Sequence, residues 1–206
     1  MENIAEVREA LCDVRRAHRI LYAYQKRMMD IIRYIAKKLD FPVIEGHKHF
    51  SNTPSKKIYN GTWAWDYIYT YLFQYYIGEK ETDDRNTEYA ISIFQFSDTG
   101  YFDKENSTRT NLSTFESEEY SESKVLFMLE VKPKESSWWW KVDDIINKKE
   151  YASKNHTSTI LKEGESTILI YSVAIEKLID EKSALNVLKE FCSFCEENSI
   201  LKLSLH

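Results

Sequence analysis

One short apolar stretch ends in two charged residues whose types and spacing could hold a metal ion. The stretch is KVLFMLEVKP, residues 124–133, which predicts a β-strand that ends at Pro133. Because side chains alternate along a strand, Glu130 and Lys132 share one face. A carboxylate can ligate Mg²⁺, and a lysine beside it can neutralise developing charge. Glu130 is therefore a candidate metal ligand, and Glu130 and Lys132 are candidate catalytic residues.

A metal site of this kind needs a second acidic residue close to Glu130. If residues 89–96 pair with residues 124–132 as a hairpin, Asp98 lies at the wrong end, on the order of 20 Å from Glu130 at ~3.3 Å per residue. The acidic residues at the start of the first strand could reach it instead: Asp83, Asp84 and Glu88. We expect Glu88 or Asp84 to complete the set.

The Glu-x-Lys motif and the order of elements around it resemble the PD-(D/E)xK family of metal-dependent nucleases. The resemblance covers about 50 residues and implies Mg²⁺ as a cofactor and a nucleic acid as substrate. None of the upstream acids follows a proline as the family motif asks. Strands commonly end at the surface with charged residues, so a solvated strand end ranks ahead of a nuclease site.

Other polar motifs offer less chemistry than this one. His47 and His49 would share a strand face and could form half of a metal site, but loop histidines without a metal rank higher. Cys192 and Cys195 have the spacing of a zinc or redox pair. Both fall on the apolar face of a predicted helix, so we interpret them as buried thiols.

Length, composition and charge set the class of protein. The 206 residues are 43% hydrophobic and 30% charged, which suits one globular domain over residues 1–206. A net charge of −5 gives no general attraction to nucleic acid. We expect no membrane segment, because no apolar run is long enough, and the charged N-terminus has no signal-peptide core. An odd cysteine count favours a reducing compartment, the cytoplasm.

Apolar residues at steps of three and four predict one long helix over residues 3–39. The stripe consists of Ile4, Val7, Leu11, Val14, His18, Leu21, Gln25, Met28, Ile32, Ile35 and Leu39. Such a repeat keeps one side of a helix against a partner. Neighbouring apolar positions widen it, which favours a helix packed on a core or in a bundle. His18 and Gln25 are polar members, and we expect each to have a hydrogen-bond partner or lie at an edge.

The rest of the chain predicts an α+β fold with a mostly antiparallel sheet covered by helices. Residues 62–78 indicate a helix, because Asp66, Thr70 and Gln74 recur every four residues. Strands are expected at 89–96 and 124–132, a hairpin at 157–175, and a short helix within 138–152. Residues 103–123 are polar and predict a mobile loop, and Asp180 is expected to cap a C-terminal helix.

Trp138, Trp139 and Trp140 cannot all face inward from one short element, so we expect at least one at the surface. Together with the stripe around Leu21, they predict an interface. We therefore expect a non-enzymatic subunit that acts through a protein partner or as a homo-oligomer. The first alternative is the metal-dependent nuclease, and the second is a small-molecule binder that uses an aromatic pocket.

Overall fold

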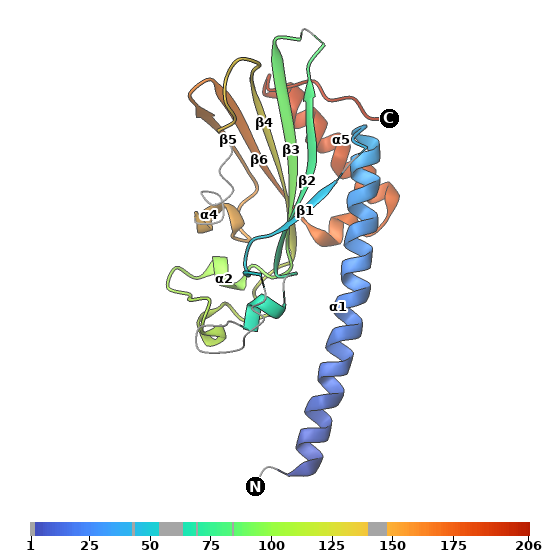
Figure 1. Ribbon diagram of the computed structural model, residues 1–206, viewed down its shortest axis with the longest axis vertical. Helices are drawn as coiled ribbons and strands as arrows, with labels where there is room; N and C mark the ends of the chain where they lie inside the picture. The colour runs from blue at the N-terminus through green and yellow to red at the C-terminus, as the bar shows by residue number, and fades with distance from the viewer. Residues whose placement is uncertain (1–2, 43, 54–63, 69, 84, 140–147) are drawn as a thin grey trace.

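An antiparallel β-sheet forms the centre of the fold (Figure 1). A computed structural model describes residues 3–42, 44–53, 64–68, 70–83, 85–139 and 148–206. Six strands within these residues pair in the order β1-β2-β3-β4-β6-β5, and each pairing is antiparallel. The strands are β1 (Glu45–Lys48), β2 (Leu72–Glu81), β3 (Thr87–Phe96), β4 (Lys124–Pro133), β5 (Ser158–Glu163) and β6 (Ser166–Ala174). The predicted α+β class with a mostly antiparallel sheet is confirmed.

Two long helices and the 3-10 turn η3 (Ile175–Leu178) lie on one face of the sheet, and the other short segments lie on the opposite face. The long helices are α1 (Ile4–Lys38) and α5 (Glu181–Glu197). The short helices and 3-10 turns are η1 (Ala64–Tyr67), α2 (Gly100–Asp103), η2 (Leu112–Thr114), α4 (Lys149–Ala152) and η3 (Ile175–Leu178). The fold is therefore a single α+β domain with a long N-terminal and a C-terminal helix.

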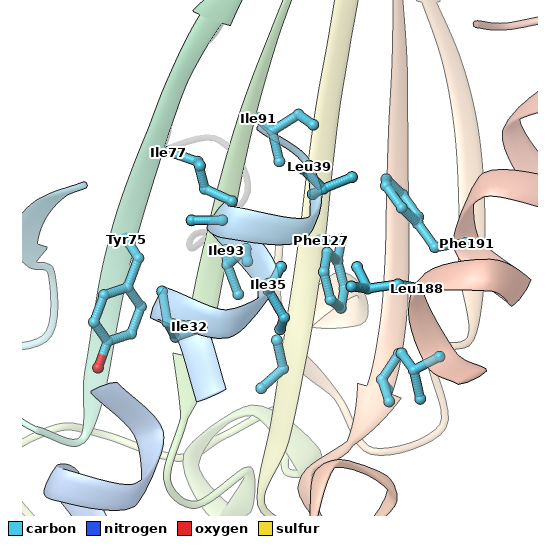
Figure 2. Packing of buried hydrophobic residues seen from close by; sticks show 14 of the residues in the cluster. Ile32, Ile35, Leu39, Tyr75, Ile77, Ile91, Ile93, Phe127, Leu188 and Phe191 are labelled. Carbon is cyan, nitrogen blue, oxygen red and sulfur yellow. The ribbon is translucent and has the colours of Figure 1, made fainter. Parts of the chain in front are cut away.

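Side chains of the central strands point alternately to the two faces of the sheet, where they pack into two separate hydrophobic cores. On one face, Ile93 of β3 and Phe127 of β4 pack with Ile35 of α1 and Phe191 of α5 (Figure 2). On the other face, Phe94 and its neighbours pack against rings from the connecting segments: Phe50, Tyr71, Phe102 and Phe115. A strand buried on both faces accounts for the nearly continuous apolar character of residues 124–131.

The first helix begins and ends close to where the sequence predicts, and the last helix begins at its predicted cap. Asn3 caps α1 by accepting a hydrogen bond from the Ala5 amide, and the chain leaves the helix through Asp40 at a φ of 61°. Asp180 caps α5, because its Oδ1 accepts a hydrogen bond of 2.7 Å from the Ser183 amide. The predicted helix over 3–39 and the predicted cap at Asp180 are both confirmed.

The strands and the hairpin were also predicted correctly. Residues 89–96 and 124–132 lie within β3 and β4, and Glu88 lies opposite Lys132 in their register. The expected hairpin at 157–175 consists of β5 and β6, and Gly164 in its turn has a φ of 61°. Asp98 follows β3 at the end away from Glu130, as the pairing requires.

The helix predicted over residues 62–78 is wrong. Among its described residues, Ala64–Tyr67 form a 3-10 turn, and β2 begins at Leu72. The alternating aromatic residues were the correct signal. The prediction assumed that polar residues in this segment face solvent. Gln74 is polar but buried, and it donates a hydrogen bond of 2.8 Å to Ser92 Oγ on β3. Gly78 lies inside β2 at a shift in register with β3, and it ends no helix.

Two further predictions concern residues 138–152, which are described only in part, and residues 103–123, which are largely irregular. The short helix expected within 138–152 is present as α4, four residues long, while 140–147 lie outside the described residues. The polar segment 103–123 contains η2 and contributes Phe115 to the second core. Its mobility stays a prediction.

We expect Gly78→Ala to destabilise the fold more than Gly164→Ala. Gly78 has a φ of 130°, and an added Cβ would lie 3.2 Å from the ring of Phe41. Gly164 has a φ of 61° with no atom within 4 Å of that position. Strain of this kind costs on the order of 1–3 kcal/mol at Gly78 and about 1 kcal/mol at Gly164. Urea unfolding of both variants measures the difference in the free energy of unfolding. Equal losses would contradict the strained backbone at Gly78, where the register between β2 and β3 shifts.

Candidate interaction surface on the first helix

The first helix is longer than the sheet on which it packs. Its 35 residues extend about 52 Å at 1.5 Å per residue. The ten-residue strands β3 and β4 extend about 33 Å at 3.3 Å per residue. The N-terminal half of α1 therefore projects beyond the sheet (Figure 1).

The C-terminal half of the apolar stripe belongs to the core. We call Gln25, Met28, Ile32, Ile35 and Leu39 the inner stripe. Its four apolar members are at most 4% exposed. They pack on the sheet beside side chains of α5 (Figure 2).

The N-terminal half of the same stripe is exposed. We call Ile4, Val7, Leu11, Val14, His18 and Leu21 the outer stripe. Its five apolar members are between 39% and 70% exposed. His18 is also exposed, on the same side of the helix. One periodic pattern therefore gives a buried half and an uncovered half on one unbroken helix.

A closed set of hydrogen bonds marks the boundary between the two halves. Gln25 Nε2 donates to Tyr75 Oη at 2.7 Å, and Tyr75 Oη donates to Gln95 Oε1 at 2.8 Å. Gln95 Nε2 then donates to Gln25 Oε1 at 3.2 Å. Burial raises the pKa of Tyr75 to about 12, so its hydroxyl keeps the proton it donates. The expectation that Gln25 has a partner in the stripe is confirmed, and the triangle fixes the direction in which α1 leaves the sheet.

Local interactions favour helix in the projecting half. The Asn3 cap satisfies one free amide, and Glu6 lies in the first turn, where negative charge is favoured. Arg16 and Asp13 form an exposed ion pair at 3.0 Å, which adds a few tenths of a kcal/mol. Most of its order comes from continuity with the anchored inner half, because an isolated helix of this length is marginal.

Charge along the projecting half changes sign. Residues 3–13 carry Glu6, Glu9 and Asp13 against a single Arg8. Residues 14–27 carry Arg15, Arg16, Arg19, Lys26 and Arg27 and no acidic residue. The N-terminal end of the surface is thus acidic and its middle is basic.

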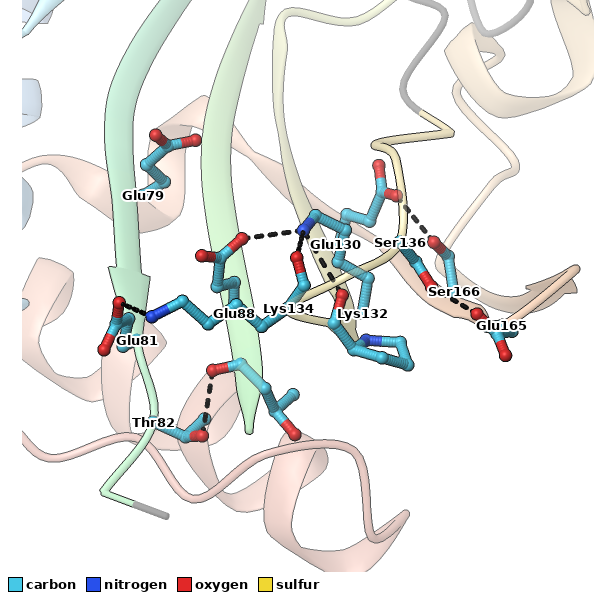
Figure 3. A network of polar contacts seen from close by, with 12 residues as sticks. Glu79, Glu81, Thr82, Glu88, Glu130, Lys132, Lys134, Ser136, Glu165 and Ser166 are labelled. Atoms are coloured by element: carbon cyan, nitrogen blue, oxygen red, sulfur yellow. Dashed lines mark hydrogen bonds and ion pairs between the residues drawn. The ribbon is translucent and has the colours of Figure 1, made fainter. Parts of the chain in front are cut away.

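The candidate nuclease residues lie far from the outer stripe in sequence, at the C-terminal end of β4 (Figure 3). Glu130 is fully buried and accepts hydrogen bonds from the Trp139 amide at 2.7 Å and from Ser166 Oγ at 2.8 Å. Lys132 is 3% exposed and pairs with Glu88 at 2.7 Å. Glu130 and Lys132 share a face of β4 as expected, and Lys132 and Glu88 meet.

These residues are engaged in bonds that connect the end of β4 to its neighbours. Glu130 holds the segment after β4 against the start of β6, and Lys132 also donates to the backbone oxygens of Pro133 and Lys134. Within the described residues, no three His, Cys, Asp or Glu side chains are grouped so that they could hold a metal ion. Asp84 lies outside those residues.

Trp138 and Trp139 lie on the opposite side of the sheet from α1. Trp139 is half-buried against the second core. Trp138 is also half-buried, and Lys132 Nζ lies 4.4 Å from the centre of its ring. Trp140 lies outside the described residues. The sequence grouped Leu21 with Trp138, Trp139 and Trp140 as one interface. Trp139 packs on the face of the sheet opposite α1, and Leu21 belongs to the outer stripe.

The remaining candidate residues from the sequence are two histidines and two cysteines. His49 pairs with Gln74 at 2.6 Å, and His47 is exposed on β1. Burial raises the pKa of Cys192 to about 11 and that of Cys195 to about 12, so both stay as unreactive thiols. A cavity of about 260 Å³ lies between α1 and the strands β1 and β2 and touches Gly46, Phe73 and Tyr75. Two aromatic rings line it, as the small-molecule alternative requires, and a bound ligand stays a prediction.

Residues 5–201 match the family described as PM0109. The chain belongs to the PM0109 family. The match to PM0109 begins at Ala5, so it includes nearly all of the outer stripe together with the sheet and α5. No curated protein and no solved structure matches the chain. In the described part of this PM0109 chain, no helix combines the length and the apolar character that a membrane crossing requires.

We expect Glu130→Ala to lower the stability of the fold. The change would leave the Trp139 amide and Ser166 Oγ without their acceptor, at a cost of about 1–3 kcal/mol for each unpaired group. Denaturant unfolding followed by tryptophan fluorescence measures it, with Glu165→Ala at the exposed hairpin turn as the control. A variant that kept full stability but lost a magnesium-dependent nuclease activity of the wild type would instead support a catalytic Glu130.

Proposed function

We propose that this protein acts without catalysis, as a subunit that associates with another protein chain through the outer stripe of α1. The other chain is either a different protein or a second copy. One observation carries the proposal: a single apolar stripe on an unbroken helix is core in its inner half and exposed in its outer half. The projecting half of α1 has the apolar pattern of a helix that packs against a neighbour, but its apolar side chains are exposed among the described residues.

The energetics of the outer stripe favour association. Single exposed apolar residues are ordinary, but the outer stripe has five on one side of a helix, with His18 between Val14 and Leu21. An apolar row of this kind marks interaction sites. Full burial of a Val, Leu or Ile side chain contributes roughly 1.5–3 kcal/mol. Several such residues together can exceed the free energy that two chains lose on association, a cost of at least ~4 kcal/mol.

Anchoring of the helix lowers the cost of binding. A free peptide with the sequence of residues 4–21 would have to form its helix when it bound, and a helix of that length is marginal in water. Here the inner stripe and the hydrogen bonds of Gln25 hold the base of the helix in place. The surface is therefore ordered before a partner arrives, which improves affinity.

The charged residues that could perform catalysis support the same proposal. Glu130 accepts two hydrogen bonds from the segments it connects, and Lys132 pairs with Glu88. These bonds account for their burial without a substrate. The nuclease hypothesis therefore ranks behind association.

We expect Leu11→Asp to abolish association and to leave the fold intact. The change places a charge in the centre of the outer stripe, where burial would be strongly unfavourable. Ala23→Asp is the matched control, because it adds the same charge to the same helix on the opposite side. Light scattering on the purified protein, and on stoichiometric complexes identified after isolation from the native host, measures association.

Circular dichroism and unfolding midpoints should be alike for the two variants, because neither position lies in the core. A wild-type chain that is monomeric and forms no complex that depends on Leu11 would contradict the proposal. So would equal association of Leu11→Asp and Ala23→Asp.

A further inference from the structure

We infer that the outer stripe binds the outer stripe of a second copy of this chain, with the two helices antiparallel. This inference rests on the proposed function and names the partner. Its basis is the self-complementary spacing of the stripe, the position of the sheet beside its inner half, and the distribution of charge along α1.

The outer stripe can pair with itself without an unmatched position. Ile4, Leu11 and His18 occupy one set of heptad positions, and Val7, Val14 and Leu21 occupy the other. In an antiparallel pair of helices, a residue of one set faces a residue of the other set. When Leu11 faces the partner's Val14, Ile4 faces the partner's Leu21, and Val7 faces the partner's His18. A single register therefore covers all six positions.

The sheet prevents a parallel arrangement. Packed helices lie 8–10 Å apart, and packed layers have a similar spacing, so a partner helix would take the place along α1 that the sheet occupies beside the inner stripe. A parallel partner, continuing past Gln25, would meet strands β2 to β4. An antiparallel partner continues past Ile4, beyond the N-terminus of the first helix, and its own sheet lies at the far end.

The charges also favour the antiparallel arrangement. In the register above, residues 3–13 of one chain lie beside residues 12–22 of the other. The first segment has Glu6, Glu9 and Asp13 against Arg8, and the second has Arg15, Arg16 and Arg19 against Asp13, whereas a parallel arrangement places each segment beside its own charge. Ala10 and Ala17 flank one side of the stripe and allow the helices to approach closely. On the other side, Arg8 of each chain meets the partner's Arg15, which gives two equivalent unfavourable contacts.

The length of the contact is sufficient because each helix is anchored. The stretch from Ile4 to Leu21 extends about 27 Å, which is short for a free coiled coil. Each chain contributes a helix that its own sheet already orders. The pair therefore gains the burial of both outer stripes without the cost of folding two helices.

Disulfide cross-linking of full-length chains tests the register directly. On a Cys12→Ser background, Ile4→Cys and Leu21→Cys are prepared as separate chains with tags of different size. These positions are about 26 Å apart along one helix, so a bond between them within one chain is impossible. We expect mild oxidation of the mixture to yield mainly the mixed dimer, at least fivefold more than either chain gives alone. Efficient cross-linking of Ile4→Cys alone would indicate a parallel pair and overturn the inference.

Charge reversal at the unfavourable contacts gives a second test. Arg8→Glu should pair with the partner's Arg15 and lower the dimer Kd about two- to fivefold, the effect of an exposed ion pair. Arg16→Glu, on the outer side of the helix, is the control and should not lower it. Sedimentation equilibrium measures both, and the wild-type chain of 24.5 kDa should approach twice that mass at high concentration. An unchanged or weaker dimer for Arg8→Glu would overturn the antiparallel register.

The outcomes separate this inference from the proposed function. A wild-type chain that stays monomeric at 100 micromolar or so overturns self-association. If that monomer forms a stoichiometric complex with one identified protein, and Leu11→Asp abolishes it, the proposed function stands with a different partner. If the monomer instead binds vesicles of anionic lipid through the outer stripe, both proposals fail.

Discussion

A mismatch in length between α1 and the sheet leaves half of the apolar stripe on α1 uncovered by the described residues. The helix extends about 52 Å and the central strands about 33 Å, so the sheet can cover only part of the apolar stripe. The covered part ends at Gln25, where the hydrogen bonds with Tyr75 and Gln95 fix the direction of the helix. Beyond this point the same pattern continues into solvent. For the proposed self-association, the position of the sheet favours an antiparallel pair, because the sheet occupies the place that a parallel helix would take.

Much of the fold could be predicted from the sequence because local patterns and burial agree. The stripe of α1, the cap at Asp180 and the turn at Gly164 each have a local physical cause that leaves a clear pattern. The segment 62–78 failed because a polar residue in a strand can be buried. Gln74 satisfies its amide through Ser92 and His49, two residues that are distant in sequence, so the spacing of polar residues imitated a helix.

The candidate site was predicted in part, for reasons that are also physical. The sequence placed the stripe correctly, but it could not divide it at Gln25, since the division depends on where the sheet ends in space. It also joined Leu21 of α1 to Trp138 and Trp139, which lie on the face of the sheet opposite α1. The Glu130 and Lys132 motif predicted the shared face. It expected Glu88 to lie beside Glu130 as a second acid, whereas Glu88 pairs with Lys132. Their bonding partners Ser166 and Trp139 come from segments that a linear motif does not contain.

Hydrogen exchange measured as a function of protein concentration tests the central claim most directly, because it reports on the two halves of α1 separately. The account predicts that amides of residues 25–38 are strongly protected at every concentration, since the sheet covers them. Amides of residues 4–21 should exchange faster in dilute protein and become protected as the concentration rises, and Leu11→Asp should remove that rise. Equal protection of both halves at all concentrations, or exchange in residues 4–21 that never responds to concentration or to a bound protein, would contradict it.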